Sequence, residues 1–195
     1  MPTVTRLRED RRGRVAVELD GGFWRTLPAD VVVRAGLVEG RALDRAAARL
    51  LRRELRRFEA LESAARALRS RDRSRAELEA RLQRRAVSPA VVEESLDALV
   101  AAGLVDDARL AQNRAASLAE RGYGDAAIRH DLERRGVTAE LVEAALCRLE
   151  PEQVRAQAVV ERRGRGLGTA RYLAGKGFGE ESLELAAGPA FGQDT

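Results

Sequence analysis

The residue types that most often carry catalysis or bind metals are scarce in this chain. It has one histidine, His130, and one cysteine, Cys147. A histidine-based triad would depend on that single residue, and zinc sites need clustered cysteine and histidine ligands. The glycine-rich run 164–168 lacks the GxxxxGK[ST] spacing of a phosphate-binding loop. The sequence therefore predicts no enzymatic activity, no metal and no cofactor.

Two adjacent carboxylates, Asp106 and Asp107, are the remaining candidates for acid–base or metal chemistry. They follow Gly103, a residue suited to ending a helix, and they precede a segment with helical periodicity. Acidic side chains at a helix start accept hydrogen bonds from free backbone N–H groups, which stabilises the helix by about 0.5–2 kcal/mol. Helix capping is thus the simpler interpretation of this pair.

Basic residues are numerous and unevenly distributed. All 35 are arginine except Lys176. Residues 41–85 contain 15 basic and 7 acidic residues, 86–150 contain 7 and 12, and 151–177 contain 6 and 2. Such segregated charge favours a polyanionic or mixed-charge partner over a neutral small molecule. The alternative is that the arginines reflect composition and cover solvated helix faces.

The elements that must position these arginines come from an internal repeat. Segment 74–99 matches segment 124–149 at a shift of 50 residues, and the matched helix-face positions are all apolar. Each copy therefore predicts two helices. The matched pairs are Leu78 with Ile128, Leu82 with Leu132, Val87 with Val137, Val91 with Leu141, Val92 with Val142, Leu96 with Leu146, and Leu99 with Leu149.

Helix ends can be predicted in both copies. In the first copy, Ser74 and Glu77 have the spacing of a capping box. In the second copy, Asp125 and Thr138 are the expected caps, and Gly136 is suited to a left-handed residue that ends a helix.

The chain before the repeat predicts a different architecture. Residues 3–27 alternate like three short strands with turns, which predicts a small β meander, and a short helix then stops at Gly36. Asp44 is expected to cap a long helix over 45–70. Its predicted buried stripe is Leu50, Leu51, Leu55, Phe58, Leu61, Ala65 and Leu68, and its predicted exposed face is Arg45, Arg49, Arg52, Arg53, Arg56 and Arg57.

A helix over 108–121 joins the two copies, so that each repeat has three helices, and a weaker third copy follows Pro151. The predicted fold is mainly α, with tandem three-helix repeats in an elongated curved array and a small N-terminal β meander. The predicted domains are a β-rich appendage (1–43), three-helix units at 44–105, 106–150 and, in degenerate form, 151–187, and a flexible tail (188–195). The chain has no apolar run of about 18 residues, which favours a cytoplasmic protein.

Four short motifs stand in order along this region. They are Ser-Arg-Ala-Glu-Leu at 74–78, Gly-Leu-Val-Asp-Asp at 103–107, Gly-Tyr-Gly at 122–124 and Arg-Gly-Val at 135–137. Over about residues 60–150 they resemble the RecX family of regulators of the bacterial recombinase RecA. The resemblance implies a non-enzymatic protein that binds the RecA nucleoprotein filament in its helical groove. It would inhibit or modulate filament assembly, ATP hydrolysis, strand exchange and coprotease activity in recombinational DNA repair and the SOS response.

The expected partners are the RecA filament and, weakly and without sequence preference, DNA, with the chain acting as a monomer. A DNA-binding protein of helix-turn-helix type and a scaffold for another acidic protein are the alternatives. The family has no catalytic residues to transfer, so the candidate contacts are chosen by charge and repeat position. They are Arg69, Arg71, Arg73, Arg75, Arg81, Arg84, Arg85, Arg134, Arg135, Arg162, Arg163, Arg165, Arg171 and Lys176.

Overall fold

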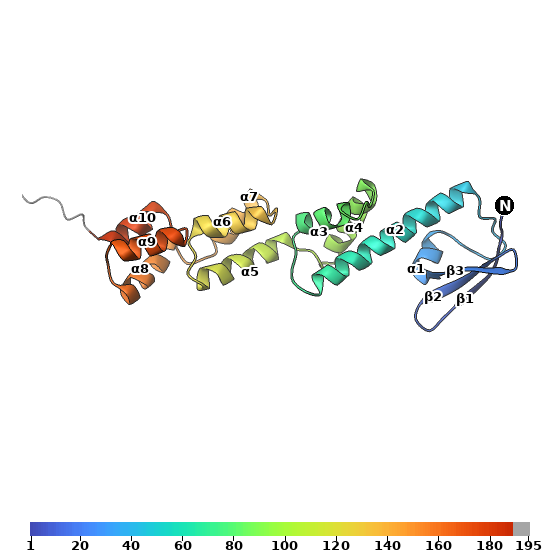
Figure 1. The fold of residues 1–195 in the computed structure, drawn as a ribbon, viewed down its shortest axis with the longest axis horizontal. Helices are drawn as coiled ribbons and strands as arrows, with labels where there is room; N and C mark the ends of the chain where they lie inside the picture. The colour runs from blue at the N-terminus through green and yellow to red at the C-terminus, as the bar shows by residue number, and fades with distance from the viewer. Residues whose placement is uncertain (189–195) are drawn as a thin grey trace, which may run out of the picture. The chain divides into compact units, whose positions relative to one another are not determined.

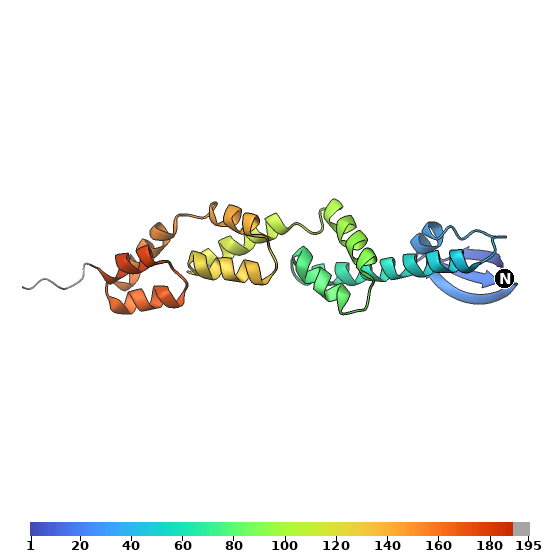
Figure 2. The same cartoon turned by 90° about the horizontal axis from the view of Figure 1, so that it is seen from above.

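The structure is a computed structural model that describes residues 1–188. Within these residues it has three strands and ten helices, which confirms a mainly α protein of tandem three-helix repeats behind a small β meander (Figures 1 and 2). Residues 189–195, nearly all of the predicted flexible tail, lie outside the described residues. The proposed domain boundaries stay predictions.

The chain divides into two compact units. The N-terminal compact unit contains residues 1–69 and 79–101, and the C-terminal compact unit contains residues 70–78 and the chain from Ala102 onward. The first turn of one helix, α3 (Arg75–Gln83), therefore belongs to the C-terminal compact unit and its later turns to the other.

The β meander has strands β1 (Val4–Glu9), β2 (Arg14–Leu19) and β3 (Gly22–Pro28), paired antiparallel in the order β1-β2-β3. Its alternation places Val15 and Val17 on a buried face. That face shares one hydrophobic core with α1 (Ala29–Arg34) and with Leu51 of the following helix. The meander is therefore built into the N-terminal compact unit through apolar packing.

Helix α2 (Arg45–Leu68) begins as expected, because Oδ1 of Asp44 accepts the N–H of Ala47 at 2.7 Å. The predicted buried stripe was wrong in detail, since only Leu51 of its seven members is fully buried. Arg57, expected on the exposed face, is buried because its Nε lies 3.1 Å from Oε1 of Glu94. The buried residues of α2 are Ala47, Leu51, Glu54, Arg57, Ala60, Ser63, Ala64 and Ala67. Small side chains let α2 and α4 approach closely, and Arg57 forms an ion pair with Glu94 inside the contact, although its Nε donates no hydrogen bond.

Residues at equivalent positions of the three repeats are buried to the same extent. Leu82, Leu132 and, in the third copy, Leu173 occupy equivalent positions, and each is at most 1% exposed. The second repeat has its own core, which includes Leu110 and Leu118, and the third repeat has another. The remaining helices are α4 (Pro89–Ala101), α5 (Asp107–Glu120), α6 (Asp125–Arg134), α7 (Ala139–Leu146), α8 (Glu152–Arg163), α9 (Leu167–Gly175) and α10 (Glu180–Ala187).

Helices α5, α6 and α7 lie together in both ribbon views, as do α8, α9 and α10 (Figures 1 and 2). None of the helices described between residues 1 and 188 combines the length and apolar character needed to cross a bilayer.

Candidate protein and nucleic-acid interface

The predicted caps explain how helices start in this region, with one exception. The capping box is confirmed, because Ser74 Oγ accepts the N–H of Glu77 at 3.0 Å and the Glu77 carboxylate accepts the N–H of Ser74 at 3.2 Å. Asp106 likewise caps α5. In the second copy, Thr138 is the N-cap residue of α7 as expected, although its hydroxyl accepts no backbone N–H. The prediction for α6 was wrong, because Gly124, not Asp125, is its N-cap.

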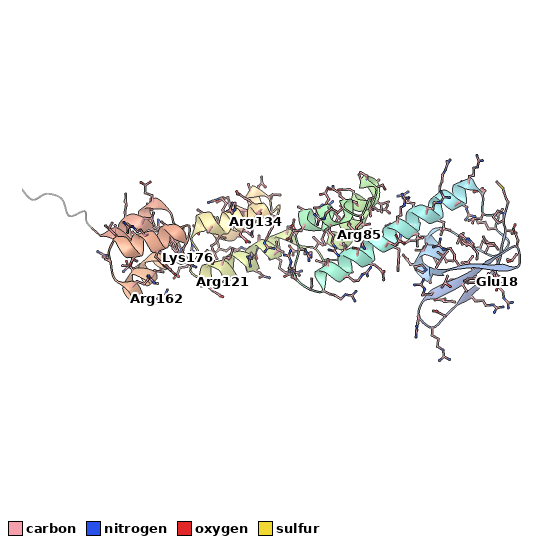
Figure 3. All side chains as sticks on the ribbon, viewed as in Figure 1. Glu18, Arg85, Arg121, Arg134, Arg162 and Lys176 are labelled. Carbon is pink, nitrogen blue, oxygen red and sulfur yellow. The ribbon has the colours of Figure 1, made fainter. Side chains whose placement is uncertain are left out.

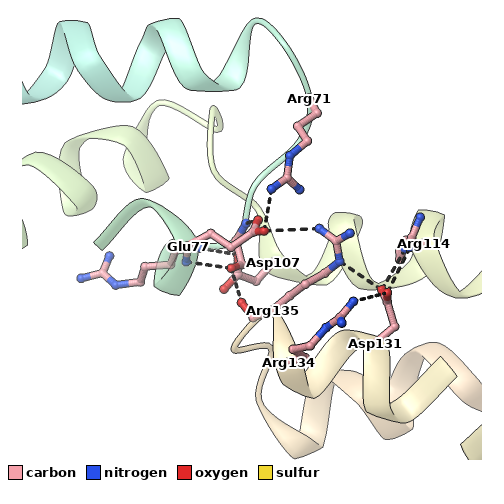
Figure 4. A network of polar contacts seen from close by, with 9 residues as sticks. Arg71, Glu77, Asp107, Arg114, Asp131, Arg134 and Arg135 are labelled. Carbon is pink, nitrogen blue, oxygen red and sulfur yellow. Dashed lines mark hydrogen bonds and ion pairs between the residues drawn. The ribbon is translucent and has the colours of Figure 1, made fainter. Parts of the chain in front are cut away.

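The start of α3 is fastened to the second repeat at what we call the first joint, residues 74–77, 107 and 135–136 (Figure 4). The Ser74 hydroxyl donates to the carbonyl oxygen of Arg135. Oδ1 of Asp107 accepts the N–H of Arg75 at 2.9 Å. Asp107 therefore has a structural role, and burial raises the pKa of its carboxyl group above the ordinary value.

A glycine closes the first joint. Gly136 has a φ of +76°, the left-handed geometry predicted for the end of α6. A Cβ at this position would lie 2.4 Å from the Cβ of Ala76. The turn after α6 thus lies directly on the first turn of α3, and only glycine fits there without displacement.

Charged side chains surround the first joint (Figure 4). Oε1 of Glu77 receives Arg71 at 2.9 Å and Arg135 at 3.4 Å. Asp131 receives Arg114 at 2.9 Å and Arg135 at 3.0 Å. Hydrogen bonds from Arg114 first and Arg135 second lower the pKa of Asp131 to about 2. Arg135 therefore links two carboxylates within the C-terminal compact unit.

The same arrangement recurs between the second and third repeats, at what we call the second joint, residues 124–127, 152 and 176–177. Here the N–H of Gly124 donates to the carbonyl oxygen of Lys176 at 2.9 Å. Oε1 of Glu152 accepts the N–H of Asp125 at 2.6 Å. A Cβ on Gly124 would lie 2.3 Å from the carbonyl oxygen of Gly177, so two backbones touch at this point.

The matched arginines of the first and second repeats divide into an outward and an inward pair. The outward pair is Arg84 and Arg134, and the Arg134 side chain is 71% exposed (Figure 3). In the inward pair, Arg85 is exposed but its guanidinium donates to Oγ of the buried Ser63 at 2.7 Å, and the Arg135 side chain is only 19% exposed. The outward pair is therefore the better placed for contact with a partner.

The predicted contacts near the first joint are mixed in exposure. Arg69 and Arg71 are exposed between α2 and α3, although Arg71 donates to the glutamate of the capping box. Arg73, Arg75 and Arg81 are half-buried. The structure thus places Arg71 and Arg75 at the first joint, where Arg71 hydrogen-bonds Glu77 and the backbone N–H of Arg75 hydrogen-bonds Asp107.

The predicted contacts of the third repeat lie on α8, α9 and the loop between them. Arg162, Arg163, Arg165 and Arg171 are exposed, and Lys176 is half-buried at the end of α9. Three further residues that sequence reasoning missed lie beside them: Arg121, Tyr123 and Tyr172. The sequence holds no local signal for this grouping, because α5 and α9 are separated by some 50 residues of chain.

The region that contains the first joint matches a known family. Family models described as "RecX, first three-helix domain" and "RecX, second three-helix domain" match residues 60–99 and 106–146. A regulatory protein RecX of Halorhodospira halophila is 35% identical over 139 residues, which cover 66% of this chain and 86% of the relative. The chain belongs to the RecX family.

Other RecX proteins extend the comparison. A regulatory protein RecX of Deinococcus radiodurans is 36% identical over 137 residues, which are 65% of this chain and 66% of that protein. A crystal structure of regulatory protein RecX has a TM-score of 0.80 at 19% identity and covers 95% of this chain and 98% of its own. RecX from Lactobacillus salivarius has a TM-score of 0.59 at 18% identity, over 67% and 94% of the two chains. The RecX fold is thus shared over nearly the whole chain, and the relatives by sequence are named as regulatory proteins.

In residues 1–188 of this RecX chain, no three His, Cys, Asp or Glu side chains are grouped so that they could hold a metal ion. The single histidine, His130, lies on α6 and is exposed, and Cys147 is exposed at the end of α7.

Proposed function

We propose that this protein regulates the recombinase RecA by binding the RecA–DNA filament in its helical groove. It would restrain filament assembly, ATP hydrolysis, strand exchange and coprotease activity, as a monomer in the cytoplasm and without catalysis of its own. Membership of the RecX family carries the proposal, because relatives are named regulatory protein RecX. The repeat adds support, since a filament presents the same surface many times.

The outward pair is the proposed electrostatic contact with the filament. Arg84 and Arg134 occupy equivalent positions in two repeats and are exposed. Exposed guanidinium groups can bind carboxylates of a protein or phosphates of DNA without reading sequence. We therefore assign the outward pair to filament contact, and the inward pair to internal hydrogen bonds that position it. The other predicted arginines remain proposed contacts.

The decisive experiment measures ATP hydrolysis by the cognate RecA on single-stranded DNA while this protein is titrated in. Hydrolysis should fall at or below equimolar protein, and an unchanged rate at that ratio would overturn the proposal. The double variant Arg84→Glu with Arg134→Glu should need about tenfold more protein for the same effect. Arg11→Glu with Arg12→Glu is the matched control, because it changes charge equally in the exposed β1–β2 turn. Circular dichroism checks that both variants keep their helicity.

The alternative, a helix-turn-helix DNA-binding protein, predicts a different result. Such a protein would bind particular duplex sites about 10³-fold or more tighter than other DNA and would retain them at moderate salt. A scaffold for an acidic protein would ignore DNA and RecA alike. Binding to a panel of duplexes therefore separates the three functions.

A further inference from the structure

Four cations gather where α5, α8 and α9 meet. Arg121 ends α5, Arg162 and Arg163 form the last turn of α8, and Lys176 ends α9. Figure 3 shows Arg121, Arg162 and Lys176 on this part of the C-terminal compact unit. Within residues 1–188, none of these four makes an ion pair with a carboxylate. They contrast with the arginines of the first joint, most of which are neutralised by Glu77 or Asp131.

Two tyrosine rings hold three of these cations in place. The guanidinium carbon of Arg163 lies 4.2 Å from the centroid of the Tyr172 ring. Lys176 Nζ lies 4.1 Å, and the guanidinium carbon of Arg121 5.8 Å, from the centroid of the Tyr123 ring. An aromatic face attracts a cation without cancelling its net charge. The charges are therefore positioned yet still available to an anion.

A pocket of about 290 Å³ opens among these residues. Its volume is close to the lower end of ligand-binding pockets, which hold about 300–1,000 Å³. The lining contains three arginines and one carboxylate, so its balance is positive. The lining residues are Glu120, Arg121, Gly122, Val159, Arg162, Arg163 and Tyr172.

We propose that this pocket binds phosphate groups of a DNA backbone. Guanidinium groups match the geometry of phosphate oxygens and donate paired hydrogen bonds to them. Lys176 is not among the lining residues, so the positive charge continues past the pocket, as successive phosphates along one strand require. This extension of positive charge beyond the pocket favours a polymer backbone over a free nucleotide. The inference deepens the DNA contact of the proposed function.

The first test is binding of fluorescein-labelled oligo(dT) by anisotropy over a salt series, without RecA. Arg121→Gln with Arg162→Gln should weaken binding about tenfold at low salt and reduce the slope of log K against log salt by about 1.4, since each lost contact to a single strand removes about 0.7. Glu120→Gln should strengthen binding about twofold, because it removes the one carboxylate of the pocket. The matched control Arg11→Gln with Arg12→Gln should keep the wild-type slope. Equal losses in the pocket variant and the control would overturn the proposal.

The second test uses Lys176, the one lysine of the chain. Acetylation by an amine-reactive reagent is followed by mass spectrometry, with the N-terminal amine as internal control. Oligo(dT) should slow acetylation of Lys176 about fivefold and leave the N-terminal rate unchanged. ATP and inorganic phosphate at the same phosphate concentration should protect it less. Equal protection by ATP would reassign the pocket to free nucleotides, and no protection by oligo(dT) would overturn the site.

These tests separate failure of the pocket from failure of the proposed function. If the wild type inhibits RecA while the pocket variant binds oligo(dT) normally, the pocket assignment fails and the regulatory function stands. If the pocket variant loses oligo(dT) binding while the wild type leaves RecA unaffected, the pocket stands and the regulatory function fails.

Discussion

In the first joint a serine side chain reaches the carbonyl oxygen that precedes a glycine, whereas in the second joint a backbone N–H reaches the equivalent carbonyl directly. Ser74 and Gly124 occupy the same repeat position, one residue before their helices, and Arg135 and Lys176 supply the two carbonyl groups. In the first joint the hydroxymethyl group of Ser74 therefore lies between the two backbone segments. In the second joint Gly124 has no such group. The two joints thus make equivalent contacts, the first through a side-chain hydroxyl and the second through a main-chain N–H.

The two joints share an acid at the first position of a helix. Asp107 begins α5 and Glu152 begins α8, and each accepts the N–H of the first residue of α3 or α6. Those first residues are Arg75 and Asp125, which carry opposite charges. The repeat thus preserves a backbone donor and a carboxylate acceptor, and it leaves the side chain at the donor position free to change.

The largest expected effect on stability comes from adding a methyl group at the glycines of the two joints. Gly136→Ala and Gly177→Ala should each destabilise the C-terminal compact unit by about 2–4 kcal/mol, from positive φ and overpacking together. Ala76→Gly should recover part of the first loss, because the Gly136 clash is with the Cβ of Ala76. Ala127→Gly should not recover the second, because the backbone N of Ala127 lies only 2.7 Å from a Cβ at 177. Urea unfolding of the two double variants checks this, and equal rescue would contradict the difference between the joints.

Removing the acid of the second joint should have the next largest effect. The Glu152 carboxylate accepts the N–H groups of Asp125 and Gly179 and the hydroxyl of Ser182, at 2.6, 2.9 and 3.2 Å. Glu152→Ala leaves these donors without a partner and should cost about 2 kcal/mol. Glu152→Gln keeps an acceptor oxygen and should cost about half as much. Hydrogen exchange at Gly179 should accelerate in the alanine variant, and an unchanged rate would count against the assignment.

The first joint should lose stability in acid through Asp131. Its pKa of about 2 lies below its unfolded value near 3.8, so its contribution is present above the unfolded pKa and is lost as the pH falls toward about 2. Asp131→Asn should cost about 1 kcal/mol at neutral pH, a figure reduced for solvent screening. The variant should also lose this part of the pH dependence. Unfolding free energies measured between about pH 5 and 2 test both points.

Asp107→Asn should have the smallest effect, with the opposite pH dependence. Burial raises the pKa of Asp107, so the ionised form is disfavoured in the folded state, and asparagine keeps an oxygen for the N–H of Arg75. We expect a change within about 0.5 kcal/mol at neutral pH. The wild type should gain stability relative to this variant as the pH falls through the raised pKa. A wild type that loses stability relative to the variant over that range would refute the sign.

The helices could be predicted from the sequence because apolar spacing, capping residues and helix-ending glycines each involve residues that are close together in the chain. The pairing of Leu82 with Leu132, the capping box and the left-handed geometry of Gly136 all follow from residue types and repeat spacing. The third copy was recognisable by the same register, although its apolar positions are fewer. Repetition thus compensates for the weakness of each single motif.

Contacts between residues that are far apart in the chain could not be predicted from the sequence. Asp125 has the residue type of a cap, yet its N–H is taken by Glu152, 27 residues later. Periodicity assigns charged residues to solvent, so it could not place Arg57 inside a contact with Glu94. The candidate interface was found only in part for the same reason. Charge clustering identified Arg163 and Lys176, while their aromatic partners Tyr172 and Tyr123 lie on α9 and in the turn between α5 and α6.

Main-chain atoms, not side chains, set the distance across the second joint. Gly124 and Gly177 meet backbone to backbone, so the third repeat is held at a fixed offset from the second whatever residues cover its outer surface. Substitutions on that outer surface can therefore change the binding properties of the third repeat without changing its position relative to the second repeat.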